Sequence, residues 1–359
     1  MMAALEGVRV MDFTTLLPGP LATLMMAECG ADVIKIERPG VGDEMRLYGP
    51  YVKGQSVPFM MLNRGKRGLT LDLKSRRGLD QALSLVRDAD VLVEQFRPGV
   101  MHALGLGYDA VRAINPDIIY CSITGYGQEG AHAGKAGHDL NYAANIGLLL
   151  LNTVEGEKPV LPHVPFADIA AGSYPALINI LLALRRRSSG YGGLHIDISM
   201  THGLAPLMYG ALARLESPLS DDQRVFSGGS PRYQVYETSD AQYLAVAAAE
   251  DRFWHKFCEL ASLDVTADIN TVAERIAQGT GQYWERTLEG ADVCCTRVRS
   301  VADYYAGPLF SSTDRSVRLA DAQANELPLP LNLALRMADQ TRFAPVMAPD
   351  ETTLTWLES

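Results

Sequence analysis

Hydrophobic and polar positions alternate along the first half of the chain in two rhythms, one typical of strands and one typical of helices. Short apolar or alternating runs predict strands at residues 7–12, 31–37, 68–73, 91–94 and 118–123. Helical apolar spacing predicts helices between them, at 20–29, 77–88 and 111–115. This alternation is typical of a parallel, doubly wound α/β sheet with helices on both faces, in which ligands bind beyond the carboxyl ends of the strands.

The pattern becomes mainly helical after residue 138. A long apolar helix is predicted over 169–187, and its basic end "RRR" suits the negative pole of a helix. The breaker "SSGYGG" precedes a strand, "LHIDISM", and a linker helix is predicted within 201–221.

A second, smaller α+β domain is predicted at 222–310. The run "GGSPRYQVYETSDAQYLAVAAAE" has the pattern of two strands joined by a turn at 238–242, and a helix is expected from Asp251. Residues 311–359 are Pro-rich and irregular, and we expect them to complete the large domain formed by 1–200.

Composition and charge limit the classes of function. The 359 residues are 47% hydrophobic and 21% charged, which is typical of a soluble protein, and the net charge of −10 disfavours general nucleic-acid binding. The five cysteines form no C-x-x-C pair, so we expect free thiols in a reducing compartment and no zinc site. With no signal peptide and no apolar segment approaching the ~18 residues of a membrane span, a cytoplasmic protein without membrane contact is expected.

A cation-rich stretch at 64–77, "RGKRGLTLDLKSRR", stands out in this acidic chain. Its six cations face one acid, Asp72. Two interpretations stay open: a local phosphate site, or a solvated turn. Arg97 follows the strand 91–94, where a ligand-facing arginine is expected.

A glycine-rich motif, "GYGQEG" at 125–130, matches G-x-G-x-x-G and follows a strand. A dinucleotide site also needs a helix that begins at the motif and an acid about 20 residues on, and both are missing. We therefore exclude a nicotinamide cofactor.

Four polar residues are candidates for chemistry, and each has a structural alternative. Asp168 precedes the long helix, so it is either an N-cap or an acid placed where a helix start stabilises an anion or enolate. His138 is either a plain exposed histidine or a proton carrier, and Asp139 beside it would most often be a cap. Glu250 ends an apolar strand and is either a cap for the next helix or a functional acid. No G-x-S-x-G motif supports a serine nucleophile.

A set of sequence motifs, taken in their order along the chain, resembles that of a known protein family. The set is "LEGVRVMDFTTLLPGPLATLMMAECGADVIKIERPGVGD", "NRGKRGLTLDLKS", "VLVEQFRPGVMHALGLGYD", "NPDIIYCSITGYGQEG", "AGHDLNYAANIG", "PFADIAAG" and "GGSPRYQVYETSDAQYLAVAAAED". With these, the chain resembles the family III CoA-transferases and, within them, the α-methylacyl-CoA racemases.

The resemblance implies a fold and partners. It implies an interlocked homodimer in which each chain has a Rossmann-like large domain and a small domain. Coenzyme A would lie on the large domain as part of an acyl-CoA substrate, and the active site would form against the small domain of the partner chain. No permanently bound cofactor and no metal are implied.

The resemblance also implies roles for the candidate residues. In the transferases the acid that matches Asp168 is a nucleophile, whereas in the racemases it is an acid/base opposed by the histidine that matches His138. Glu250 matches the glutamate that assists this histidine. The implied contacts with coenzyme A are Arg38, Leu71, Lys74, Gln95, Phe96, Arg97, Tyr126 and Asp139, with Arg67 a further basic match and Glu94 beside the adenine.

Two features depart from the racemase pattern. Arg297, in "CCTRV", replaces a proline common in the family, and the loop 42–60 is more like that of a transferase. We expect a racemase or epimerase of 2-methylacyl-CoA thioesters, because His138 and Glu250 occur together in a chain of this length. A family III CoA-transferase with Asp168 as nucleophile is the alternative.

Overall fold

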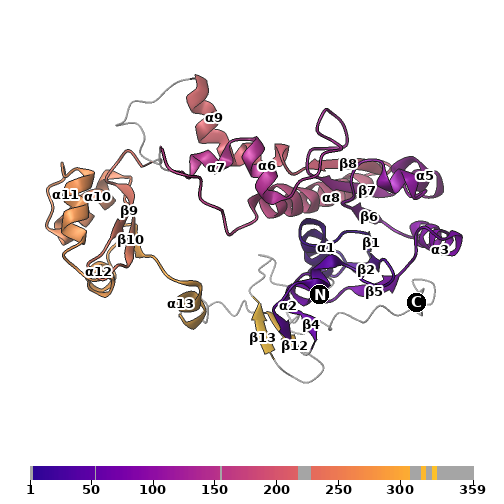
Figure 1. The fold of residues 1–359 in the computed structure, drawn as a ribbon, viewed down its shortest axis with the longest axis horizontal. Coiled ribbons are helices and arrows are strands. Elements are labelled where there is room, and N and C mark those ends of the chain that lie inside the picture. Colours follow the sequence, from indigo (N-terminus) through magenta and orange to yellow (C-terminus); the bar gives the residue numbers. More distant parts are fainter. Residues whose placement is uncertain are drawn as a thin grey trace. The chain divides into compact units, whose positions relative to one another are not determined.

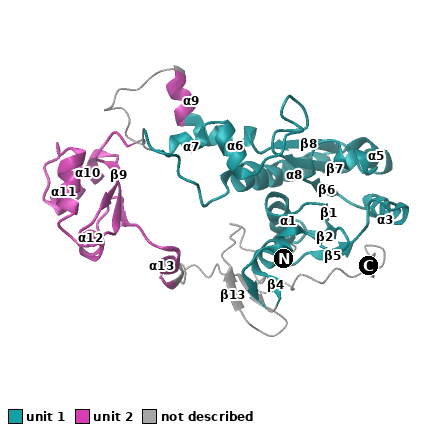
Figure 2. Cartoon of the chain, viewed as in Figure 1, with its two compact units in different colours: residues 1–209, 315–359 teal, residues 210–314 magenta. Residues whose placement is uncertain are grey.

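The computed structural model describes residues 3–52, 54–153, 156–216, 228–307, 317–320 and 326–329. The chain divides into two compact units, one formed by Met1–Tyr209 with Arg315–Ser359 and one formed by Gly210–Asp314 (Figure 2). The predicted return of 311–359 to the large domain falls, apart from two short strands, outside the described residues, as does the end of the predicted linker at 217–221.

A six-stranded parallel sheet forms the centre of unit 1 (Figure 1). Its strands are β1 (Arg9–Asp12), β2 (Asp32–Glu37), β5 (Arg67–Thr70), β6 (Val91–Glu94), β7 (Ile119–Thr124) and β8 (Leu194–Ser199). The spatial order β5-β2-β1-β6-β7-β8 reads 3-2-1-4-5-6 along the chain, the doubly wound order whose switch point lies between β1 and β6. The predicted parallel α/β architecture is confirmed.

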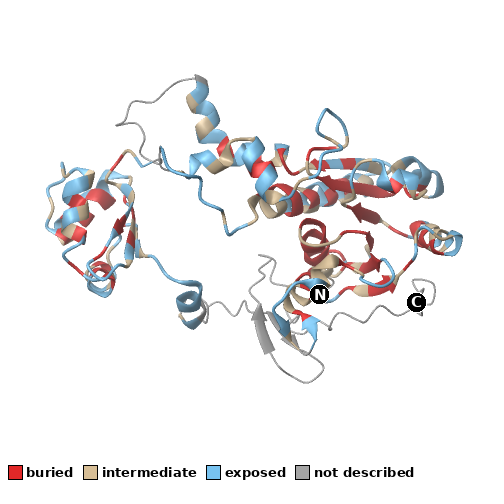
Figure 3. Cartoon of the chain, viewed as in Figure 1, coloured by how far each residue is buried: buried red, intermediate tan, exposed pale blue. Residues whose placement is uncertain are grey.

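Helices cover both faces of this sheet. On one face lie α1 (Pro18–Glu28), α6 (Asp139–Asn145), the π-helical segment η2 (Ala167–Ser173) and α8 (Tyr174–Arg187). On the other lie α3 (Arg76–Val86), α4 (Val100–Ala103) and α5 (Tyr108–Ile114). Figure 3 shows that the central strands of this sheet are buried. Val91 and Val93 pack toward the first face and Leu92 toward the second, which explains why the first three residues of this strand are all apolar.

One helical stretch, Ala167–Arg187, is apolar and long enough to cross a membrane by length and composition alone, with a hydropathy of 1.5. The prediction that no apolar segment approaches that length is therefore wrong for this stretch. Ala171, Ala176, Ile180 and Ala183 pack it into the core of unit 1, and core helices pass the same test, so a span has weak support.

Shorter elements complete unit 1. They are η1 (Glu44–Leu47), β3 (Tyr51–Val52), β4 (Gln55–Ser56), α2 (Val57–Asn63), α7 (Leu148–Leu151), η3 (His202–Met208) and the pair β12 (Val317–Ala320) and β13 (Glu326–Leu329). The predicted helix after residue 200 consists of the 3-10 segment η3 and then α9 (Tyr209–Glu216), because Pro206 lies within the first part.

An antiparallel sheet and helices form unit 2. The strands are β9 (Tyr233–Glu237), β10 (Tyr243–Ala247) and β11 (Cys295–Arg297). The helices are α9 without its first residue, α10 (Asp251–Ala261), α11 (Ile269–Ile276), α12 (Gly281–Leu288) and α13 (Val301–Ala306). Trp254 and Trp284 are buried at the core of this unit. The predicted pair of strands, with a turn between them and a helix from Asp251, is confirmed.

The cation-rich stretch begins with two buried side chains. Arg64 and Lys66 are 0% and 2% exposed, so neither the phosphate site nor the solvated turn describes them. Arg64 pairs with Glu28, and the Nζ atom of Lys66 lies 3.0 Å from a carboxylate oxygen of Asp12. Burial disfavours the charge of Asp12, but the attraction of Lys66 and Lys35 more than offsets this and holds the pKa of Asp12 well below its usual range.

Lys66→Met should destabilise the protein by about 3–5 kcal/mol, because it removes the partner of a buried charge. Lys66 also donates to the carbonyl of Pro20, the hydroxyl of Thr23 and the amide oxygen of Asn63, which would lose a donor. Urea unfolding measures the change. The control is Arg76→Met, which removes an 87% exposed cation paired with Asp80 and should cost less than about 1 kcal/mol. An equal loss of unfolding free energy in the two variants would contradict the expectation that breaking the buried pair costs more than breaking the exposed one.

Candidate active site

A cavity of about 400 Å³ lies at the switch point of the sheet. Thr15 and Leu16, which follow β1, and Gln95–Arg97, which follow β6, form part of its wall. Both segments leave the carboxyl ends of adjacent central strands. This is the position where doubly wound sheets bind ligands.

His138 and Asp168 both line this cavity. His138 stands at the N-cap of α6, where its main-chain N–H donates to the side-chain oxygen of Asn141 at 3.0 Å. Its side chain is exposed to solvent, so the imidazole is accessible from the cavity. An imidazole and a carboxylic acid, separated by 30 positions in the chain, are thus brought to one shared space.

Asp168 does not cap the helix that follows it. The first two amides of η2, those of Ala167 and Asp168, donate instead to one oxygen of Asp139 at 2.6 and 3.0 Å. The cap interpretation of Asp168 is therefore wrong. Asp139, which lies in α6, caps the start of η2. These two amides are consequently occupied, so they do not fit the expected role of binding an enolate.

The carboxylate of Asp168 receives no hydrogen bond from the described residues. Burial, and then the negative charge of Asp139, raise the pKa of Asp168 to about 7. Its backbone lies in a π-helical turn, a feature common at functional sites. A carboxyl group with these properties takes up and releases protons near neutrality.

Tyr142 also lines this cavity and explains the first glycine of the glycine-rich motif. A Cβ atom added at Gly125 or Gly137 would lie 2.4 or 2.6 Å from the ring of Tyr142, so only glycine fits at either position. The hydroxyl of Tyr142 donates to the carbonyl of Gly137, and Tyr126 packs edge-on against the ring at 5.3 Å. The first glycine of "GYGQEG" thus makes room for an aromatic ring. Sequence reasoning gave Tyr142 no role, although it lies in the "GHDLNY" segment.

Six of the eight residues expected to contact coenzyme A fall into three groups. Gln95, Phe96 and Arg97 line the cavity, with the Gln95 side chain already bound to the carbonyl of Thr15 and the amide of Gly19. Arg38 and Lys74 are exposed at the same sheet edge, after β2 and β5, and Arg38 pairs with Glu44 at 2.7 Å. Leu71 as a whole residue is 4% exposed, its side chain packs in the core, and its main-chain N–H donates to the carbonyl of Glu37, so it offers little surface to a ligand.

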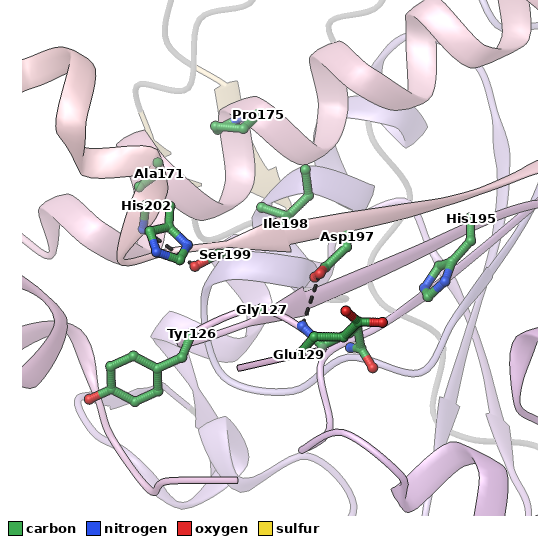
Figure 4. A pocket seen from close by; sticks show the side chains of 12 residues that line it. Tyr126, Gly127, Glu129, Ala171, Pro175, His195, Asp197, Ile198, Ser199 and His202 are labelled. Atoms are coloured by element: carbon green, nitrogen blue, oxygen red, sulfur yellow. Dashed lines mark hydrogen bonds between the residues drawn. The ribbon is translucent and has the colours of Figure 1, made fainter. Parts of the chain in front are cut away.

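Tyr126 lines a second cavity of about 570 Å³ rather than the first (Figure 4). His195, Asp197 and Glu129 also surround this second cavity. His195 Nε2 lies 2.9 Å from the hydroxyl oxygen of Ser122. Ser122 also hydrogen-bonds to Glu94, whose burial raises its pKa to about 7. Within the described residues, no group of three His, Cys, Asp or Glu side chains could hold a metal ion.

Glu250 lies in unit 2, immediately before α10. Glu250 occupies the N-cap position of α10, as the cap interpretation expects, but its carboxylate makes no cap hydrogen bond with that helix. Its side chain is exposed. Its pairing with His138 remains a prediction.

The sequence profile described as CoA-transferase family III matches residues 5–350. The chain belongs to CoA-transferase family III. The resemblance drawn from the motifs is confirmed at the level of the family, whose members are enzymes that act on acyl-CoA.

Curated members of family III similar to this chain have two different activities. The human succinyl-CoA:glutarate CoA-transferase is 32% identical over 324 residues, covering 85% of this chain and 74% of that protein. The human alpha-methylacyl-CoA racemase is 34% identical over 312 residues, covering 82% and 78%. Family membership alone therefore leaves two activities open.

Solved structures in family III share the fold. A CAIB/BAIF family protein from Brucella suis superposes with a TM-score of 0.82 at 29% identity, covering 98% of this chain and 97% of that chain. A protein from Mycobacterium tuberculosis gives a TM-score of 0.84 at 26% identity and covers 99% of both chains.

Asp139→Asn should lower the pKa of Asp168 from about 7 by about one pH unit, because it removes the negative charge that helps to raise it. The asparagine oxygen can still accept from the amides of Ala167 and Asp168, so the helix start should stay in place. NMR titration of a labelled Asp168 carboxyl carbon measures the shift. Asp139→Ala, which removes the acceptor as well, is the comparison variant. An unchanged midpoint in Asp139→Asn would contradict the electrostatic effect.

Proposed function

We propose that the protein racemises or epimerises 2-methylacyl-CoA thioesters by moving one proton through an enolate. The presence of His138 and Asp168 on the wall of one cavity is the observation that carries this proposal. Racemisation at a single carbon needs one proton carrier on each face of a planar intermediate. An imidazole opposite a carboxylic acid meets this need.

The proposed reaction conserves atoms and charge. One group removes the α-proton, and the electron pair of the broken C–H bond delocalises into the thioester as an enolate. The opposite group then donates a proton to the other face of the carbon. A carboxyl pKa of about 7 on Asp168 suits both halves of the cycle, and imidazole is the side chain used most often as a general acid or base.

Glu250 is proposed to orient the imidazole of His138. The absence of a cap hydrogen bond leaves its carboxylate available for this role. Following the resemblance, we propose a homodimer in which Glu250 comes from the unit 2 of the partner chain.

A CoA-transferase is the second candidate, favoured by the names of several relatives and by the open carboxylate of Asp168. A carboxylate oxygen of Asp168 would attack the acyl-CoA carbonyl and expel the CoA thiolate, leaving a mixed anhydride. The thiolate would then attack the Asp168 acyl carbon and release the first acid. An acceptor carboxylate would next attack the Asp168 thioester and expel the thiolate, leaving a second mixed anhydride. The thiolate would finally attack the acceptor's acyl carbon, which forms the new acyl-CoA and releases the Asp168 carboxylate.

Incubation with a single enantiomer of a 2-methylacyl-CoA in deuterated water separates the two activities. Incorporation of α-deuterium together with loss of optical purity, without any added acid, is the result expected for the racemase. Exchange of CoA that requires an acceptor acid, with a hydroxylamine-sensitive adduct on Asp168 and no α-deuterium, would overturn the proposal in favour of the transferase.

A further inference from the structure

The loop between β1 and α1 builds one wall of the site cavity in an unusual backbone conformation. Thr15, Leu16 and Pro18 line the cavity. Leu16 has a φ of 60°, in the left-handed region that a leucine rarely adopts. Such a conformation persists only where surrounding contacts hold it.

Side chains from other parts of unit 1 hold the main chain of this loop. The amide of Leu16 donates to Oδ1 of Asp43 at 2.9 Å. The Nζ atom of Lys35 donates to the carbonyl of Thr14 at 2.7 Å, and Gln95 donates to the carbonyl of Thr15 at 2.6 Å. Three successive residues of the loop are thus fixed by side chains of distant segments.

Asp43 and Lys35 form a buried ion pair behind the loop. They are 0% and 1% exposed, and Lys35 Nζ lies 2.9 Å from Oδ2 of Asp43. The amide of Asp43 in turn donates to Glu37 at 2.8 Å, which fixes its backbone. Neither Asp43 nor Lys35 lines the cavity, so neither side chain is placed to touch a ligand there.

A buried ion pair is weak support for stability, since apolar replacements are often as stable. The pair does fix the orientation of the Asp43 carboxylate. Lys35 holds one of its oxygens and the Asp43 backbone is fixed as well, so the second oxygen, Oδ1, is held in one position. Two amides donate to this oxygen: that of Leu16, the residue with the left-handed backbone, and that of Met45 at the start of η1.

We propose that Asp43, backed by Lys35, is a positioning residue that holds Leu16 in its left-handed conformation and so shapes the wall against which coenzyme A binds. The inference rests on the part of the proposed function that both activities share, the binding of coenzyme A at this cavity. It does not depend on the choice between racemase and transferase.

A double-mutant cycle on Asp43 and Leu16 tests the inference, with coenzyme A as the probe and calorimetry as the measurement. Asp43→Ala should weaken binding about tenfold, because the loop relaxes away from the left-handed conformation. In the Leu16→Gly background the same change should weaken binding only about twofold, because glycine adopts this φ without steric cost. Asp43→Asn keeps an oxygen for the Leu16 amide and should lose less binding than Asp43→Ala.

Equal losses of binding in the two backgrounds, or wild-type binding by Asp43→Ala, would overturn the inference. Urea unfolding of all variants shows whether a loss reflects general destabilisation, and Asp80→Ala on the surface of α3 is the control that should bind normally. A wild-type protein that binds coenzyme A and shows the coupling, but gives no α-deuterium exchange, would contradict the racemase and leave the positioning role supported. A wild-type protein that does not bind coenzyme A would overturn both.

Discussion

Asp168→Asn is expected to lower turnover by about 10²–10⁴-fold, the usual contribution of a positioned acid or base. Asparagine has nearly the shape of aspartate but neither carries a proton at neutral pH nor attacks a thioester. The amides of Ala167 and Asp168 are held by Asp139, so the start of η2 should be unaffected. Initial rates of α-deuterium incorporation and of acid-dependent CoA exchange measure the loss.

The matched control for this variant is Asp109→Asn. Asp109 is also an acid in the first turn of a helix of unit 1, but it is exposed and does not line the cavity. This control should keep wild-type rates. Turnover by Asp168→Asn at close to the wild-type rate would show that neither proposed mechanism operates at Asp168.

His138→Ala is expected to slow racemisation by about 10²–10⁴-fold. One partial reaction, exchange of the α-proton on the face of Asp168, should remain. Asp168 alone can still remove and return a proton on its own face of the α-carbon. One enantiomer should therefore continue to exchange its α-proton with deuterated solvent, while the other should not. Separation of the enantiomers followed by mass spectrometry measures both rates.

His102→Ala, which removes an exposed histidine from the last turn of α4, is the control and should leave both rates unchanged. The two proposed functions differ sharply for His138→Ala. A transferase has no need of a proton carrier opposite Asp168, so acid-dependent CoA exchange that survives the substitution, without enantiomer-specific deuterium exchange in the wild type, would refute the racemase.

The pattern of apolar positions was sufficient to predict the architecture of unit 1 because each central strand is buried on both faces. The first three residues of the run 91–94 are all apolar, since Val91 and Val93 face one helical layer and Leu92 the other. The order of the strands in the sheet was not part of that prediction. It arises from long-range pairing, such as that of β1 with both β2 and β6.

The roles of single charged residues were the least predictable from local sequence. Arg64 and Lys66 stand in a stretch that looks solvated, yet their acids, Glu28 and Asp12, lie 36 and 54 positions away. Asp168 stands where a cap is expected, but the cap comes from Asp139, 29 positions earlier. In each case the deciding partner is remote along the chain, and local patterns carry no information about it.

The sequence by itself determined the alternation of strands and helices, the membership of family III and the choice of His138 and Asp168 as candidates, because periodic burial and motifs are written in neighbouring residues. Only the tertiary structure decided that these two side chains line one cavity and that a buried ion pair holds Leu16. It also decided that Asp139, rather than Asp168, accepts the hydrogen bonds at the start of η2. The physical reason is that hydrogen bonds and burial join segments which the sheet brings together at its carboxyl edge, however far apart they lie in the chain.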